Sequence, residues 1–162
     1  MEAKIRIQAA LDMQAKQEAA DVERKNDTEK RQTEGLAAFE KARVEIIEPT
    51  IEELSLAIRA AGNEVDVERN GAAAGDAQAP ITSVDIFIRP KRVVGKPIPK
   101  EKLASLRFEH MLVPPGIAIQ LRTSNTASER PKSEKVMPAA LTADKVGELF
   151  SELVEKGLPI FI

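Results

Sequence analysis

Residues 36–68, LAAFEKARVEIIEPTIEELSLAIRAAGNEVDVE, decide the fold because the spacing of apolar residues changes within this stretch. Up to residue 61 the apolar residues repeat with the 3.6-residue period of a helix that covers a core. The residues on this face are Leu36, Phe39, Ile47, Leu54 and Ile58. Pro49 would kink an ordinary helix, yet the apolar phase continues through it. The pattern therefore favours one kinked helix, or two nearly collinear helices with Pro49 in the first turn of the second.

After Gly62 the period becomes two, which predicts a half-buried strand at residues 64–68. Alternating apolar residues predict three further strands at residues 81–89, 103–109 and 117–121. Residues 72–80 and 123–135 are predicted to be loops, and the apolar tail 158–162 is expected to pack on the body. Four successive strands favour an antiparallel meander. A last amphipathic helix follows Thr142, which is an N-cap candidate, and is expected to stop at Gly157.

Upstream of this stretch, residues 23–34 contain no aliphatic or aromatic side chain. A helix that is polar all round projects into solvent, bridges to a partner or does not form. Because residues 3–33 are rich in good helix formers, we expect a helical arm over 1–34, a coiled coil or partly disordered, with a break at Gly35. Residues 35–162 would form one domain. The predicted fold class is α+β: the arm, a kinked helix, a four-stranded mainly antiparallel sheet, and a C-terminal helix covering one sheet face.

The alternation gives the sheet two faces of different chemistry. The inner face carries Val65, Val67, Val84, Ile86, Ile88, Leu106, Phe108, Ile117, Ile119 and Leu121. The outer face carries Glu64, Asp66, Glu68, Asp85, Arg89, Arg107, Glu109 and Arg122. Alternate carboxylates on one strand could hold a hard cation, but arginines on the same face favour cross-strand ion pairs. We therefore predict no metal site.

The composition excludes several classes of site. The chain has no cysteine and one histidine, which excludes thiolate ligands, disulfides and a histidine metal cluster within one chain. Aromatic residues make up 3% of the chain, which argues against recognition of bases or sugars by stacking. We expect no cofactor. The first residues lack the apolar segment of a signal peptide, and no apolar run approaches the roughly 18 residues of a membrane span. The expectation is a cytoplasmic protein without a membrane partner.

His110 is the candidate for catalysis. The alternation places it on the inner face at the end of the third strand, beside Met111 and Leu112. A general base needs an orienting partner and a nucleophile, and the sequence contains no Gly-x-Ser-x-Gly motif. A packed histidine is the favoured interpretation. A small-molecule enzyme that uses His110 with a carboxylate stays as an alternative.

A basic segment, residues 89–107, is the candidate for anion binding. Residues 89–135 carry 11 basic and 4 acidic groups, whereas the whole chain has a formal charge of −2. The candidate residues are Arg89, Lys91, Arg92, Lys96, Lys100 and Lys102. They could contact phosphates or another polyanion, including nucleic acid. No aromatic residue interleaves them, and a solvated loop is the favoured interpretation.

The arm carries a narrow apolar stripe at helical spacing. Its residues are Ile7, Leu11, Ala15, Ala19 and Val22. The stripe is too thin to bury much area against a domain, and a partner helix would explain it. We therefore predict a non-enzymatic protein of the scaffold or adaptor kind, which self-associates as a homodimer or binds another protein through its N-terminal helix.

Overall fold

The computed structural model describes residues 1–71, 80–112, 115–123 and 131–159. The chain divides into two compact units, Met1–Glu34 and Gly35–Ile162, and the division falls where the sequence changes from polar to apolar. Residues 72–79 of the predicted loop 72–80, residues 124–130 of the predicted loop 123–135, and residues 160–162 of the apolar tail lie outside the described residues. Leu158 of that tail packs partly buried against the core.

The first helix, α1, extends over Glu2–Ala42. The predicted break at Gly35 is therefore wrong. A glycine inside a helix costs about 1 kcal/mol relative to alanine, which does not end a helix whose neighbours on both sides are good helix formers. Phe39 and Ala42 are the buried residues of α1.

A π-helical turn, Arg43–Ile47, joins α1 to α2, which extends over Glu48–Ala60. Pro49 lies in the first turn of α2, as predicted. Its ring removes the backbone donor that the carbonyl group four residues earlier would use in an α-helix. The backbone N–H of Glu48 donates instead to the carbonyl of Arg43, five residues earlier. The wider turn accommodates Pro49, so α2 follows directly after the π turn.

The wider turn also rotates α2 relative to the predicted face. Ile51 and Ser55 are the buried residues of α2, whereas Leu54 is 38% exposed. The assignment of Leu54 to the core face was therefore wrong. A straight 3.6-residue period selects Leu54, but a π turn accommodates more residues, and the buried residues Ile47, Ile51 and Ser55 are four apart. The predicted residue Ile58 does pack, partly buried, against the core.

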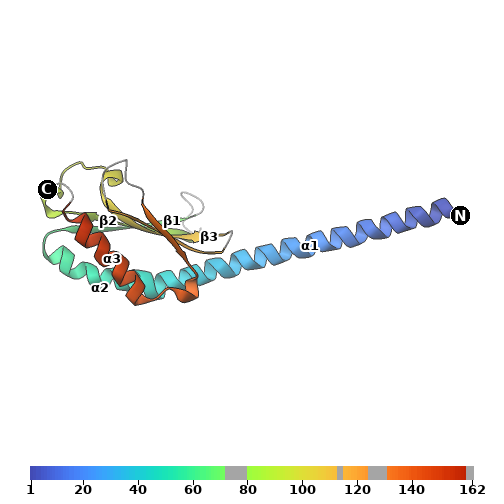
Figure 1. The fold of residues 1–162 in the computed structure, drawn as a ribbon, viewed down its shortest axis with the longest axis horizontal. Coiled ribbons are helices and arrows are strands. Elements are labelled where there is room, and N and C mark those ends of the chain that lie inside the picture. The colour runs from blue at the N-terminus through green and yellow to red at the C-terminus, as the bar shows by residue number, and fades with distance from the viewer. Residues whose placement is uncertain (72–79, 113–114, 124–130, 160–162) are drawn as a thin grey trace. The chain divides into compact units, whose positions relative to one another are not determined.

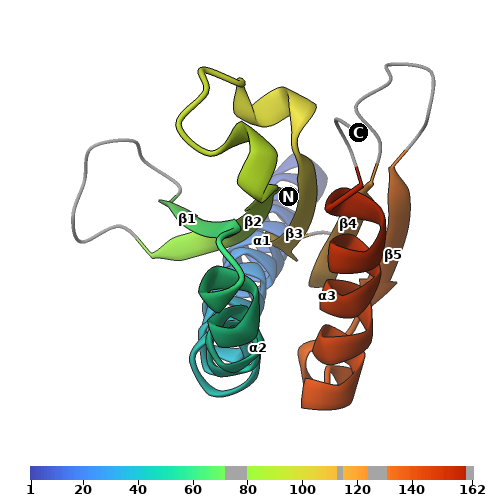
Figure 2. The ribbon, with the colours of Figure 1, turned by 90° about the vertical axis from the view of Figure 1, so that its left-hand side faces the viewer.

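The sheet has five antiparallel strands in the order β1-β2-β3-β4-β5. Its strands are β1 Glu64–Gly71, β2 Ile81–Arg89, β3 Ala104–Met111, β4 Gly116–Arg122 and β5 Lys132–Val136. The meander is confirmed, but the prediction of four strands is wrong. The fifth strand occupies the end of the predicted polar loop. It is an edge strand (Figure 2) and mostly exposed, so burial does not impose an apolar alternation on it.

One face of the sheet is covered by α2 and by α3, which extends over Ala143–Gly157 (Figures 1 and 2). Nine of the ten predicted inner residues are buried, and Val67 packs partly buried against the same core. The Thr142 hydroxyl accepts a hydrogen bond from the Lys145 N–H at 3.2 Å, which confirms the predicted N-cap. Two short 3₁₀ turns, Lys91–Val93 and Lys100–Lys102, lie between β2 and β3.

Gly157 ends α3, and its position has a packing reason. A Cβ atom there would lie 2.8 Å from the Cβ of Ala104 on β3. Real Cβ atoms do not approach so closely, so only glycine lets the last turn of α3 lie directly on the sheet. The sequence marked this residue as a helix stop, and the structure adds the close contact.

Candidate functional sites

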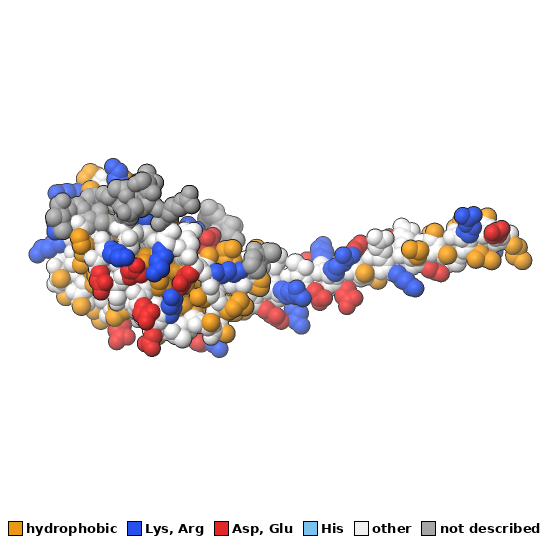
Figure 3. Space-filling view, viewed as in Figure 1, with side chains coloured by type: hydrophobic (Ala, Val, Ile, Leu, Met, Phe, Trp, Pro, Cys, Tyr) orange, Lys and Arg blue, Asp and Glu red, His pale blue; other side chains and the backbone are white. Residues whose placement is uncertain are grey.

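The arm presents its apolar stripe without any buried residue. All residues from 1 to 34 are exposed, and the exposed fractions of Ile7, Leu11 and Val22 are 61%, 52% and 59%. Orange hydrophobic side chains lie among charged ones toward the N-terminal end of this helix, whereas the part of the arm next to the body carries mainly charged and other polar side chains (Figure 3). A single-turn ion pair joins Asp21 to Arg24, and Gln8 donates to Asp12 at 3.1 Å. These local contacts support the helix without covering the stripe.

The basic segment uses the side chains of two of its six candidate residues, Arg89 and Lys100, for ion pairs and hydrogen bonds within the domain. Arg89 lies 3.7 Å from Glu64 and donates to the carbonyl of Ile98 at 3.3 Å. Lys100 pairs with Glu68, and its ammonium group lies 5.4 Å from the ring centroid of Phe87. These contacts hold the β2–β3 connection on the outer face of the sheet.

The other four candidate residues are exposed. The backbone N–H of Lys91 donates to Asn63 at 2.8 Å, and the Lys91 side chain packs where a Cβ on Gly62 would lie. Arg92 and Lys96 are exposed, as is Lys102, and none of these three forms an ion pair within the described part of the chain. The structure thus leaves three of the six predicted anion-binding side chains available, spread along the connection.

The outer face of the sheet carries charged side chains that form ion pairs with one another. Arg107 lies 3.7 Å from Asp85, its cross-strand partner, and 3.5 Å from Glu109. Burial raises the pKa of Asp85 above its ordinary value, against the opposing effect of Arg107. Arg122 donates instead to backbone carbonyls, at 3.2 Å for Leu103. Among the described residues, no group of three or more carboxylate or histidine side chains is placed to hold a metal ion.

His110 is packed against apolar groups at the end of β3. Its ring lies 5.9 Å from the ring of Phe39, centroid to centroid. Both ring nitrogens are shielded from solvent and have no hydrogen-bond partner among the described residues. Burial lowers the pKa of His110 below its ordinary value, which favours the neutral ring. The part of the chain that the structure describes offers His110 no orienting partner of the kind that a catalytic histidine uses.

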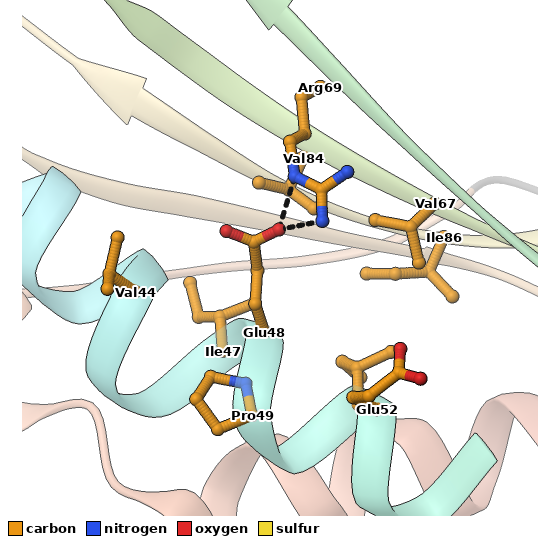
Figure 4. Close-up of a pocket in the computed structure, with 10 residues that line it drawn as sticks. Val44, Ile47, Glu48, Pro49, Glu52, Val67, Arg69, Val84 and Ile86 are labelled. Carbon is orange, nitrogen blue, oxygen red and sulfur yellow. Dashed lines mark hydrogen bonds and ion pairs between the residues drawn. The ribbon is translucent and has the colours of Figure 1, made fainter. Parts of the chain in front are cut away.

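A pocket that sequence reasoning missed lies between the π turn and the first two strands (Figure 4). Its volume is about 290 Å³, at the lower limit of typical ligand pockets. Most of the lining is apolar and comes from Val44, Ile47, Pro49, Ile51, Val67, Val84 and Ile86. The one signal in the sequence was Pro49, because a proline in a helical pattern marks a place where the backbone departs from α geometry.

One carboxylate at this pocket holds two arginines. Glu48 forms ion pairs with Arg43 and with Arg69, whose guanidinium faces it across the pocket in Figure 4. The Arg43 side chain is only 10% exposed and that of Glu48 19%. The pairs tie the start of α2 to β1. Since Glu48 is engaged on both sides, the arrangement is a structural clamp and supplies no unpaired charge from Glu48 for chemistry.

No protein-family model, curated protein or solved structure matches this chain. Within the described residues, none of the helices combines the length and the apolar character that crossing a bilayer requires.

Proposed function

We propose that the protein works by association, and that the N-terminal arm is the surface through which it self-associates. The observation that carries this proposal is the exposed apolar stripe of the arm. Ile7, Leu11 and Val22 lie on one side of the helical arm, residues 1–34, in which no residue is buried. The core cluster of the described residues, by contrast, begins at Phe39 and is built by the body alone.

Physical chemistry supports a helical partner for this stripe. Helix nucleation is costly, and most helical stability in proteins comes from packing of an apolar face rather than from intrinsic propensity. Full burial of one large aliphatic side chain contributes about 1.5–3 kcal/mol. The few such residues on each arm give a modest driving force against the cost of association, so we expect assembly that depends on protein concentration.

The test is the mass of the full-length protein in solution, measured by light scattering over a range of concentrations. We expect a rise from 17.7 kDa towards a multiple of that mass. The variant Ile7→Gln/Leu11→Gln should stay monomeric. Ile5→Gln/Met13→Gln is the matched control, since it removes two exposed apolar side chains from a different side of the helix and should associate normally.

Circular dichroism would establish that both variants keep a folded body. A wild-type protein that stays at the monomer mass at every concentration would exclude self-association. An equal loss of mass in both variants would show that the stripe is not the interface.

A further inference from the structure

The arm carries two opposite charges placed symmetrically about Leu11, one of the residues of its apolar stripe. Lys4, Leu11 and Glu18 are each seven residues apart. A straight α-helix drifts by about 20° per seven residues, so the three side chains lie nearly on one line of the helix surface. Because α1 is helical throughout this segment, the line is a property of the folded arm. It coincides with the stripe, of which Leu11 is a member.

Resting on the proposed function, we infer that the partner of the arm is a second copy of the same arm, bound in the antiparallel direction about a two-fold axis at Leu11. A two-fold interface brings residue i of one copy against residue j of the other, and j against i. About Leu11, Lys4 of each copy then faces Glu18 of the other. The two ion pairs flank the contact between the two Leu11 side chains.

A parallel pair of arms would bring like charges together. In register, it places Lys4 beside Lys4 and Glu18 beside Glu18, and like charges across a helix pair destabilise it. The antiparallel arrangement turns both repulsions into attractions. It also opposes the two helix dipoles, which is the favourable orientation for neighbouring helices.

The sizes of the side chains along the stripe also favour the antiparallel direction. Two-fold symmetry about Leu11 puts Ile7 of one copy opposite Ala15 of the other. Large residues then lie against small ones, which lets two surfaces interdigitate. A parallel pair would place Ile7 against Ile7 and Ala15 against Ala15, which alternates crowded layers with empty ones.

Charge reversal distinguishes the two directions in the full-length protein. In an antiparallel pair, Lys4→Glu alone and Glu18→Lys alone each turn two attractions into repulsions, so each should raise the dissociation constant about tenfold. The double variant Lys4→Glu/Glu18→Lys should restore it. In a parallel pair each single variant only exchanges one like-charge contact for another, so unchanged affinity in both single variants would overturn the inference.

A distance measurement gives an independent result, because the chain has no cysteine to compete for labels. A spin label at Gln32→Cys lies beyond the paired segment. The antiparallel pair places two such labels about 60 Å apart at 1.5 Å of rise per residue, whereas a parallel pair places them side by side. A short distance would refute the antiparallel direction and leave self-association standing, and the absence of any interchain distance would refute both.

Discussion

Gly35 of α1 lies directly against the ring of His110 on β3: a Cβ atom added to Gly35 would be 3.1 Å from Cε1 of His110. Few real Cβ atoms have so close a neighbour. The contact explains why a glycine occupies a helical position that it does not terminate. Helix and sheet approach each other here because the residue on the helix has no side chain.

This relationship predicts that the effect of Gly35→Ala depends on His110. Alanine is favoured over glycine in a helix by about 1 kcal/mol, but in the wild type the new methyl group presses on the imidazole ring. In a His110→Ala background the ring is gone, and Gly35→Ala should stabilise the protein by the full amount. Urea unfolding of the four proteins gives the coupling energy, which we expect to be on the order of 1 kcal/mol. Equal effects of Gly35→Ala in both backgrounds would contradict the contact.

His110 also predicts a pH dependence of stability. Burial holds its pKa below the ordinary value of 6.5. Between pH 6.5 and the lower pKa of the folded state, the unfolded chain binds a proton that the folded chain does not. The free energy of unfolding therefore falls as the pH falls through this window, and the ring contributes no pH dependence above it.

The variant His110→Leu should remove this contribution, and it also removes a buried N–H donor that has no partner among the described residues, whose burial costs about 1–3 kcal/mol. We expect the variant to be more stable than the wild type at pH 7.5, by an amount that grows at pH 5. Comparing the two proteins at each pH cancels other groups such as Asp85, whose raised pKa acts in the opposite direction. A stability difference that does not change with pH would show that His110 is not held neutral.

The sequence predicts those strands of the fold in which burial of one face imposes an apolar pattern. Strands β1 to β4 were predicted because one face of each is buried, which imposes apolar residues at alternate positions. Strand β5 was not predicted because its side chains on the core side do not form an apolar pattern. They are Lys132, Glu134 and Val136, and the first two are charged. Both charged side chains form ion pairs with side chains of α3: Lys132 lies 3.4 Å from Glu152, and Glu134 lies 2.8 Å from Lys145.

The candidate sites also divide into those that the sequence predicts and those that form only in the folded chain. Helical spacing identified the stripe of the arm, since that pattern is local in sequence. The clamp at Glu48 joins residues 43, 48 and 69, which come together only after the π turn and the β1 register are formed. No spacing rule connects them. The partners of Arg89 and Arg107 were predictable, because antiparallel register sets cross-strand neighbours, whereas the backbone partners of Arg122 were not.

Two glycines of α3 predict opposite effects of the same substitution. A Cβ on Gly147 would have an ordinary 3.9 Å contact with Leu54, whereas one on Gly157 would be 2.8 Å from the Cβ of Ala104. Gly147→Ala should therefore stabilise the protein by about 1 kcal/mol through helix propensity. Gly157→Ala should destabilise it by about 1–3 kcal/mol, as overpacking does. Thermal unfolding measures both, and a stabilising Gly157→Ala would show that α3 does not approach β3 this closely.

The clamp at Glu48 predicts an asymmetry between removing one charge and removing a pair. Glu48→Ala leaves Arg43 as a nearly buried cation without its main partner, and loss of one member of such a pair typically costs about 3–5 kcal/mol. Replacing both members with apolar residues, as in Arg43→Met/Glu48→Leu, removes the uncompensated charge, so the double variant should be more stable than Glu48→Ala. Glu40→Ala is the matched control, because Glu40 lies 3.5 Å from the same Arg43 but is 64% exposed, and exposed pairs contribute about 0–1 kcal/mol. Urea unfolding of the three variants checks this order. If Glu48→Ala cost no more than Glu40→Ala, Glu48 would not be the residue that holds the start of α2 to the sheet.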